Sequence, residues 1–407
     1  MPLIKPFAGL RPVVAHAADV VAPPYDVLNS DEARERAQGK PMSFLHISKA
    51  EIDLPGDISV YDPKVYAKSA ENMQKLIKQA VLIRDKTPCY YVYRLTMGEH
   101  VQTGLVCVAS VKDYDSNRIR KHEFTRPAKE DDRVRQIEAL NAQTGPVLLA
   151  YKSRTDMDAL LQAVTADKPL YDIQADDGIG HAFWLVNNAA TIEKISVIFD
   201  AMPALYIADG HHRSAAASRV AASKGGDVNA MSQYFLAVVF PHNQMKILDY
   251  NRVITDLNGL TKADFLQLVQ KRFSCVEHVG PMHPARAGEF GMYLDGKWYR
   301  LNIQSGLIPQ DPVKKLDVSL LADHLLQPIL GINDPRTDTR IDFVGGMRGL
   351  KELEKRVNSG EMAVAFAMYA TSMNDLMAVA DNNQVMPPKS TWFEPKLADG
   401  LVSHVLD

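Results

Sequence analysis

Hydrophobic and polar residues follow two periods along the chain, and the changes of period outline its secondary structure. Apolar residues that recur every three to four positions predict helices, here over residues 64–82, 129–141, 155–166 and 190–200. A shorter helix is expected at 30–38, and Thr155 is the expected N-cap of its helix. Runs rich in β-branched and aromatic residues predict strands, here at 89–98, 100–114, 146–152, 170–174 and 181–187.

The later part of the chain continues this mixture. Residues 234–254 predict a hairpin, as do 89–114. An amphipathic helix at 262–273 is followed by strands through 289–304, a helix at 316–330 and a strand at 363–370. We therefore expect an α/β fold of mixed α+β character. Because 407 residues exceed one ordinary core, we predict three regions: 1–114, a central domain at 115–260, and 261–407.

Composition narrows the class of protein. The net charge is −3, which gives no general attraction to nucleic acid or an anionic membrane. Three cysteines lie far apart without a metal-binding spacing, as expected in a reducing compartment. No run approaches the roughly 20 apolar residues that a membrane span requires. We expect a soluble, cytoplasmic protein.

The segment Asp209-Gly210-His211-His212-Arg213 concentrates the polar chemistry of the chain. It follows the apolar run 204–207 and precedes an alanine-rich stretch that ends at Lys224 and two glycines, so it predicts a strand, a tight turn and a helix start. Unpaired N–H groups at a helix start bind phosphate, and an arginine adds a fork of donors. Asp209 would repel phosphate unless a divalent metal bridges the two, which predicts Mg²⁺ at Asp209.

Simpler interpretations stay open. An aspartate before a helix is an ordinary N-cap, and Arg213 is able to pair with a surface acid. Zinc binding by the two histidines is disfavoured, because neighbouring helical residues point about 100° apart and no third ligand is evident. The turn at 22–27 is expected to be rigid, with Tyr25 and Asp26 as candidates for lining a substrate pocket.

Eight segments carry a resemblance to known proteins. The chain resembles the domain-of-unknown-function 1015 family almost end to end, and its DGHHRSAAA segment is similar to the ParB/sulfiredoxin-type superfamily, most closely the free-serine kinase branch. The matching segments are PFAGLRP, VAPPYDV, MSFLHI, KHEFT, DGHHRSAAA, LDYNRVI, DFVGG and MPPKSTWFEPKL. This resemblance implies a ParB/sulfiredoxin-like centre with N- and C-terminal α/β elaborations, since the first ~110 and last ~140 residues have no counterpart in the kinases.

The resemblance also implies site residues. In the kinases a glutamate upstream of the DGHHR-like turn is the base on the serine hydroxyl, which points to Glu123. An alcohol that attacks a phosphoryl group needs such a proton acceptor. Lys121, Arg126 and Arg133 are candidates for holding phosphate oxygens. The alternative is a solvated charged loop, because residues 118–135 hold seven cationic and four acidic side chains.

These observations lead to one expected function and two alternatives. We expect a small-molecule kinase that transfers phosphate from a nucleotide (ATP or ADP) or from pyrophosphate to a small hydroxyl acceptor, with free L-serine as the leading candidate. Asp209 would hold Mg²⁺, the stretch from Gly210 to Arg213 would bind phosphates, and Glu123 would be the base. A ParB-like nucleotide-binding switch and a non-catalytic scaffold are the alternatives. Nucleic acid and membrane partners are not expected, and the oligomeric state stays open.

Overall fold

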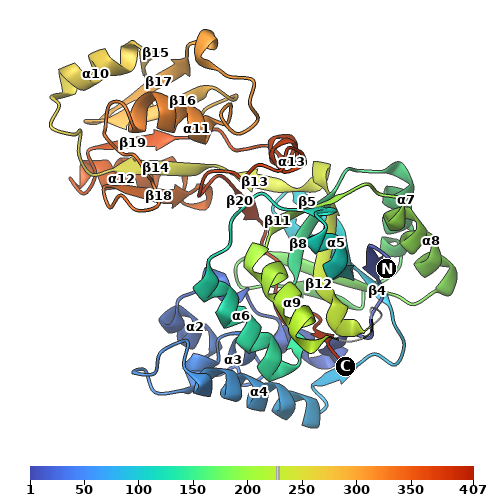
Figure 1. The fold of residues 1–407 in the computed structure, drawn as a ribbon. Helices are drawn as coiled ribbons and strands as arrows, with labels where there is room; N and C mark the ends of the chain where they lie inside the picture. Colours follow the sequence, from blue (N-terminus) through green and yellow to red (C-terminus); the bar gives the residue numbers. More distant parts are fainter. Residues whose placement is uncertain (226, 228–229) are drawn as a thin grey trace. The chain divides into compact units, whose positions relative to one another are not determined.

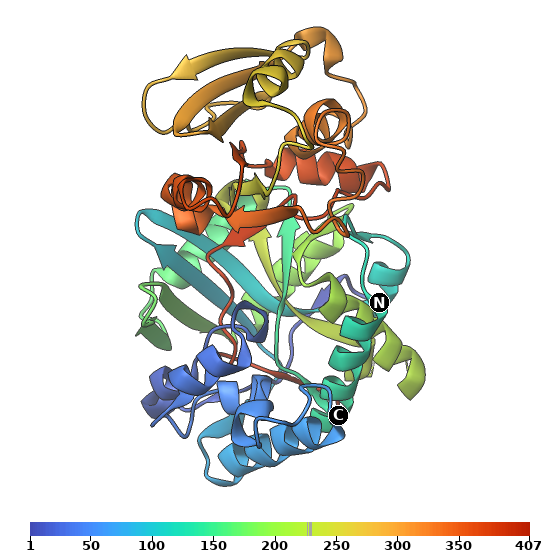
Figure 2. The same cartoon turned by 90° about the vertical axis from the view of Figure 1, so that its left-hand side faces the viewer.

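The computed structural model of the chain describes residues 1–225, 227 and 230–407. It divides into two compact units (Figure 1). Unit 1 comprises Met1–Met245 and Pro395–Asp407, and unit 2 comprises Lys246–Glu394. Unit 2 is therefore an insertion in the sequence of unit 1, and Figures 1 and 2 both place the two chain termini in unit 1.

A nine-stranded mixed sheet forms the centre of unit 1. Its strand order is β6-β11-β8-β12-β5-β4-β10-β9, with β1 paired to β5. The β6–β11 and β8–β12 pairs are parallel and the others are antiparallel. The bounds are β1 Ile4–Lys5, β4 Tyr90–Met97, β5 His100–Ser110, β6 Ile119–Arg120, β8 Val147–Tyr151, β9 Tyr171–Gln174, β10 Gly180–Val186, β11 Leu205–Asp209 and β12 Tyr234–Pro241.

Helices bury the apolar side chains of this sheet. One continuous core joins strand residues such as Leu149, Ile207 and Val239 to residues of four helices. The four are α5 (Val111–Asp115), α7 (Thr155–Thr165), α8 (Ala189–Asp200) and α9 (His211–Lys224). Helix α6 (Pro127–Leu140) packs along α9, as Figure 1 shows.

A second core in unit 1 belongs to the N-terminal helices and short strands, which group together in Figure 2 in blue. Phe44, Leu45 and Ile47 pack there against Met73 and Leu76. The bounds are α1 Ala17–Val20, α2 Ser30–Ala37, α3 Leu45–Ser48, α4 Pro63–Lys78, β2 Leu10–Pro12, β3 Leu82–Arg84, β7 Ala142–Gln143 and β21 His404–Val405. Strands β7 and β21 pair, so the C-terminal segment is part of this region.

Unit 2 has its own core around an antiparallel six-stranded sheet of order β15-β17-β16-β19-β14-β18. The strands of unit 2 are β13 Lys246–Leu248, β14 Tyr250–Ile254, β15 Phe273–His278, β16 Glu289–Leu294, β17 Lys297–Ile303, β18 Ile341–Gly345, β19 Val364–Ala367 and β20 Trp392–Glu394. Of these, β13 and β20 form a separate two-stranded sheet. Its helices are α10 Lys262–Gln270, α11 Asp317–Leu321, α12 Gly349–Asn358 and α13 Met373–Asp381. A π-helical turn, Ala322–Leu326, continues α11.

The mixed α/β class is confirmed, and most predicted elements form within a few residues of their expected ends. Two local predictions are wrong. Residue Arg154, not Thr155, is the N-cap of α7. Residues 234–254 do not form a hairpin, because β12 pairs with β5 and β8, whereas β13 pairs with β20 and β14 with β18 and β19.

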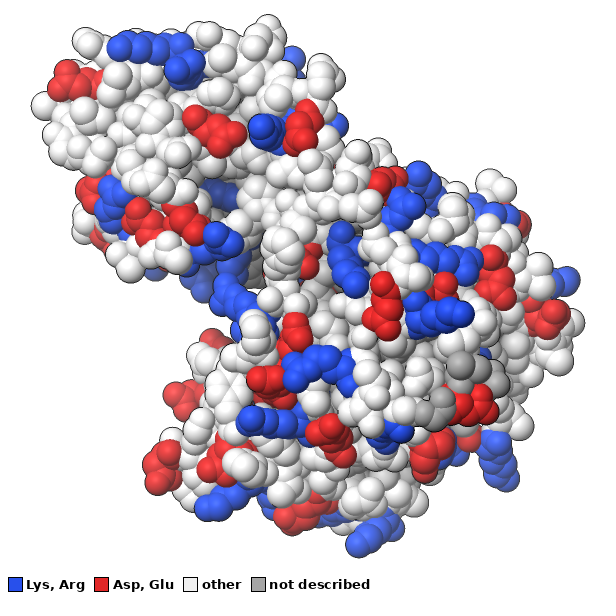
Figure 3. Space-filling model, in the orientation of Figure 1, with Lys and Arg blue, Asp and Glu red and all other residues white. Residues whose placement is uncertain are grey.

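The chain has two compact units where the sequence predicts three regions. A boundary near residue 114 is not seen because β4 and β5 lie in the same sheet as β8, β11 and β12. The predicted boundary at 260 falls inside unit 2, and the last 13 residues, Pro395–Asp407, return to unit 1. On the face shown in Figure 3, acidic and basic side chains are interspersed over both units, in keeping with the small net charge of −3.

Candidate functional site

The predicted strand, turn and helix form at residues 205–224. Strand β11 ends at Asp209, Gly210 makes the turn, and α9 begins at His211. Gly210 has φ +99°, a conformation in which a Cβ atom is disfavoured. A Cβ there would also lie 3.1 Å from Nε of Arg213 and 3.3 Å from Cα of Val147. Glycine also has no side chain that could cap the first turn of α9. The N–H groups of that turn are therefore suited to bind an external acceptor.

Strand pairing brings Glu123 to this turn. Strands β6 and β11 are parallel neighbours, with Ile119 opposite Leu205. The chain therefore leaves both strands at the same edge of the sheet, with residues 121–126 after β6 and residues 210–213 after β11. Oε2 of Glu123 lies 3.7 Å from Nδ1 of His211, and the Glu123 side chain is 56% exposed.

Both histidines connect the helix start to the segment that carries Glu123. The backbone N–H of His122 donates to Nε2 of His211 over 3.4 Å. The backbone N–H of Arg126 donates to Nε2 of His212 over 3.0 Å. The sequence analysis expects His211 and His212 to help bind phosphates, but the Nε2 atoms of both rings act as acceptors of backbone N–H groups. Each neutral ring then carries its proton on Nδ1, which in His211 faces Glu123.

Burial keeps these imidazoles neutral. It lowers the pKa of His211 well below its usual value, and the adjacent His122 adds to the effect. Burial also lowers the pKa of His122 to about 4. The rings of His122 and His211 meet edge to face, with centroids 4.5 Å apart. Burial and nearby Lys129 lower the pKa of His212 in the same direction. At neutral pH the positive charge of the site comes from other residues.

Arg213 supplies one of these charges. Its Nη1 donates to the carbonyl of Pro146, and its Nη2 lies 3.6 Å from Asp26 and 3.8 Å from Asp209. Burial lowers the pKa of Arg213, but the carboxylates of Asp26 and Asp209 outweigh it and raise the pKa above its ordinary value. The guanidinium is thus permanently charged and anchored on one side by a backbone carbonyl.

Two residues of the C-terminal segment complete the site, and the sequence analysis missed both. Nζ of Lys396 lies 3.2 Å from Oδ2 of Asp209. Asp399 is 1% exposed, and its Oδ1 has no hydrogen-bond partner among the described residues. Burial raises the pKa of Asp399 to about 7, against the lowering effect of Arg213. Both lie in or just after a motif of the family resemblance, yet nothing in the local pattern connects them to Asp209.

Acidic and basic side chains therefore alternate in the cluster around Asp209. Burial raises the pKa of Asp209, but Lys396 and then Arg213 outweigh burial and hold that pKa well below its usual range. The carboxylate is ionised at any physiological pH. It faces two cations, at 3.2 and 3.8 Å.

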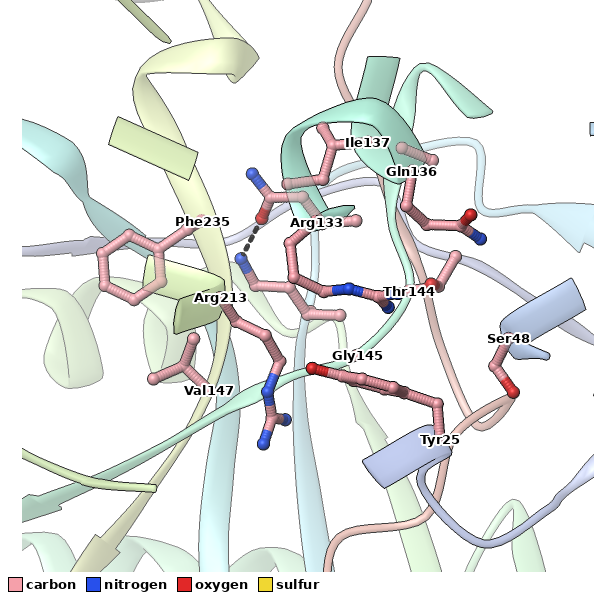
Figure 4. A pocket seen from close by; sticks show the side chains of 13 residues that line it. Tyr25, Ser48, Arg133, Gln136, Ile137, Thr144, Gly145, Val147, Arg213 and Phe235 are labelled. Carbon is pink, nitrogen blue, oxygen red and sulfur yellow. Dashed lines mark hydrogen bonds between the residues drawn. The ribbon is translucent and has the colours of Figure 1, made fainter. Parts of the chain in front are cut away.

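Two cavities adjoin this cluster. The first offers about 30 Å³ that a water molecule can occupy. Figure 4 shows Tyr25, Arg133 and Arg213 converging on it. The second offers about 250 Å³ and is also lined by Tyr25 and Arg133, together with Asp26 and His212. Tyr25 and Asp26, named from the sequence as candidates for lining a pocket, thus both line a cavity next to the predicted turn.

The predicted cationic residues have different surroundings. The guanidinium of Arg133 lies 3.9 Å from the ring centroid of Tyr25 and pairs with Asp132 at 2.6 Å. The ammonium of Lys121 lies 3.8 Å from the ring centroid of Tyr114. Arg126 is the N-cap residue of α6, and its backbone N–H is the group that binds His212. Arg133 lines the smaller cavity together with Arg213.

A bound metal would depend on Asp209 and on ligand oxygens. In the described part of the chain, no three His, Cys, Asp or Glu side chains group closely enough to hold a metal ion. Mg²⁺ on nucleotide phosphates needs only one or two protein carboxylates. An ionised Asp209 at the helix start fits that requirement. Over the same residues, no helix is both long and apolar enough to cross a membrane.

Comparison with known families supports the resemblance. Residues 4–319 match the family described as "Protein of unknown function (DUF1015)". The chain belongs to this family. The match contains Asp209 and Glu123 but ends before the segment 386–397. No curated protein matches the chain.

The solved structures that the chain matches have low sequence identity and TM-scores below 0.5. One is a conserved hypothetical protein from Pyrococcus furiosus, at 15% identity over 73% of this chain and 94% of that chain, with a TM-score of 0.35. Another is a free serine kinase in complex with AMP, at 14% identity over 73% and 92%, with a TM-score of 0.35. A third is SbnI with a C-terminal truncation from Staphylococcus aureus, at 9% identity over 72% and 85%, with a TM-score of 0.39.

Proposed function

We propose that the protein is a phosphotransferase that moves phosphate from a nucleotide (ATP or ADP) or pyrophosphate to a small hydroxyl acceptor, with free L-serine as the leading candidate. The proposal rests on one observation above others: the Glu123 carboxylate lies beside His211, at the start of a helix suited to bind phosphate. A proton acceptor and an anion site at one place are the two requirements of phosphoryl transfer to an alcohol.

The turn at Gly210 and the start of α9 would bind the phosphates. Backbone N–H groups after Gly210 would donate to phosphate oxygens, and the partial positive charge of the helix start would favour them. Arg213 would add charge-assisted hydrogen bonds. Its anchor on the Pro146 carbonyl supports a fixed orientation.

Glu123 would act on the hydroxyl acceptor. Its carboxylate would accept the proton of the hydroxyl as the oxygen attacks phosphorus. His211 would orient the carboxylate through its Nδ1–H, since its Nε2 is occupied by the backbone N–H of His122. The exposure of Glu123, 56% of its side chain, leaves room for a small acceptor to approach.

Asp209 would hold Mg²⁺ that arrives with the phosphates. The metal would neutralise phosphate charge and so remove the repulsion between phosphate and carboxylate. Lys121, Arg126 and Arg133 would steady phosphate oxygens, and Arg133 has the best support because it lines a cavity with Arg213.

The test is a matrix of donors and acceptors with the full chain. ATP, ADP and pyrophosphate are each incubated with Mg²⁺ and with L-serine, L-threonine or glycerol, and phosphorylated product is measured by mass spectrometry. We expect O-phosphoserine with at least one donor, and much less from Glu123→Gln. Glu71→Gln, which removes an exposed carboxylate on α4, is the matched control.

Three outcomes separate the interpretations. Product that depends on both donor and acceptor supports the phosphotransferase. Nucleotide binding without transfer to any acceptor refutes it and supports the nucleotide-binding switch. Absence of binding to every donor supports the scaffold.

A further inference from the structure

We propose that Lys396 is a phosphate-contacting residue of the site, releasing Asp209 when a phosphate ligand binds. The inference deepens the proposed function and rests on it. It adds a residue that the family match, which ends at residue 319, does not reach. The observation that carries it is the 3.2 Å contact between the Lys396 ammonium and Oδ2 of Asp209, at the start of α9.

The backbone near Lys396 is firmly held in unit 1. The N–H of Ala398 donates to the Tyr93 hydroxyl over 3.3 Å. Asp399 and Ala22 exchange two backbone hydrogen bonds, of 2.9 and 3.1 Å. The position of Lys396 beside Asp209 therefore follows from a paired backbone two to three residues away.

The side chain is better able to move than its neighbour. Lys396 is 27% exposed, whereas Arg213 is 10% exposed. Arg213 is anchored on the Pro146 carbonyl and lies near Asp26. A lysine ammonium is a compact charge on a flexible stem with three donors, so it can follow a phosphate. Of the two cations at Asp209, Lys396 is the one suited to change partner.

The charges at the site explain why Lys396 would change its partner from Asp209 to phosphate. Lys396 neutralises the half-buried carboxylate of Asp209 at 3.2 Å, and leaving that carboxylate without a nearby cation would be costly. When phosphate binds together with Mg²⁺, Asp209 would hold the metal, whose charge would neutralise the carboxylate. The Lys396 ammonium would then be able to donate to phosphate oxygens bound at the start of α9.

The experiment compares Lys396→Met and Lys396→Arg with wild type by isothermal titration calorimetry. Wild type is first titrated with ATP, ADP and pyrophosphate in the presence of Mg²⁺, and the tightest of these is used for the variants. Adenosine, which lacks phosphate, is the second ligand. The control is Lys40→Met, which removes an exposed lysine paired with Asp176 at 2.8 Å elsewhere in unit 1. Thermal unfolding checks that each variant is folded.

We expect Lys396→Met to weaken binding of the phosphate ligand about 10- to 100-fold, the range for a hydrogen bond to a charged group. Adenosine affinity should not change, Lys396→Arg should recover most of the loss, and Lys40→Met should bind as wild type does.

Three results overturn the inference. If wild type binds the phosphate ligand and Lys396→Met binds it equally well, Lys396 only neutralises Asp209, while the proposed function stands. If phosphate ligand and adenosine weaken equally, the effect of Lys396 is structural. If wild type binds none of the phosphate ligands, the proposed function fails and the inference fails with it.

Discussion

Asp399 should contribute a pH dependence to the stability of unit 1, and its replacement by asparagine should remove that contribution. The carboxyl group is 1% exposed, its Oδ1 lacks a hydrogen-bond partner within the described part of the chain, and burial raises its pKa to about 7 against the opposing effect of Arg213. An unfolded aspartate has a pKa of about 3.9. Between these two values the folded chain keeps a proton that the unfolded chain has released.

The sign and size follow from this difference. Because the folded state binds more protons, stability falls as pH rises, by up to about 1.4 kcal/mol per pH unit. The fall begins near the unfolded pKa and ends just above the folded one. Between pH 5 and pH 8 the two titration curves give a loss of about 2–3 kcal/mol from this one group. An asparagine at this position would carry no titrating proton, so Asp399→Asn should lack this loss.

The assay is urea unfolding of wild type and Asp399→Asn at pH 5 and pH 8. Unit 1 holds a single tryptophan, Trp184, which is 5% exposed, and unit 2 holds Trp298 and Trp392. A background in which the latter two are replaced by phenylalanine makes fluorescence report on unit 1. Asp57→Asn, at an exposed aspartate, measures the effect of removing a carboxyl group in general. If wild type and Asp399→Asn differ by the same free energy at both pH values, the reasoning is refuted.

Three further predictions concern the proposed reaction. Arg213→Ala should weaken nucleotide binding by about 1.5–3 kcal/mol, and unchanged affinity by calorimetry in a folded variant would contradict its role. Asp209→Asn should abolish the Mg²⁺ dependence of binding or turnover; if a chelator leaves wild-type affinity and rate intact, Asp209 does not act through a metal. Glu123→Gln keeps the shape of the side chain but cannot accept the proton, so turnover should fall about 10²- to 10⁴-fold with little change in nucleotide affinity. A variant that phosphorylates at the wild-type rate excludes Glu123 as the base.

The turn at 209–213 could be predicted because its determinants are local. An apolar run, a glycine and an alanine-rich stretch each specify their own conformation, and the structure has β11, Gly210 at φ +99° and α9 in that order. Local rules also located the first hairpin, β4 and β5, whose strands are neighbours in both sequence and sheet.

The position of Glu123 depends on a pairing with no local signal. Strand β6 has two residues, Ile119–Arg120, too few for a recognisable period. Its parallel pairing with β11 is what brings residues 121–126 to the turn. From the sequence, only the resemblance to the kinases pointed to Glu123; composition favoured a solvated loop equally well. The geometry adds a neighbour, His211, while the catalytic role stays a prediction.

Residues Lys396 and Asp399 were missed because the chain returns to unit 1 after an insertion of 149 residues, Lys246–Glu394. The same insertion explains the wrong hairpin at 234–254. The apolar run of β12 is followed closely by the short strand-like segments of β13 and β14, but the partners of β12 lie in unit 1 and those of the other two in unit 2. A local pattern describes a strand and contains nothing about which strand pairs with it.

A carboxylate at a phosphate site repels the phosphate, and the sequence analysis accounts for this with a metal ion that bridges the two groups. The structure adds a second cation to the argument, because Lys396 already neutralises Asp209 without any ligand. On the proposals above, Asp209 pairs with Lys396 before a phosphate ligand binds and with Mg²⁺ afterwards, so the half-buried carboxylate always has a cation beside it. A lysine that changes partner then costs the site little electrostatic free energy on binding, since one neutralised pair replaces another.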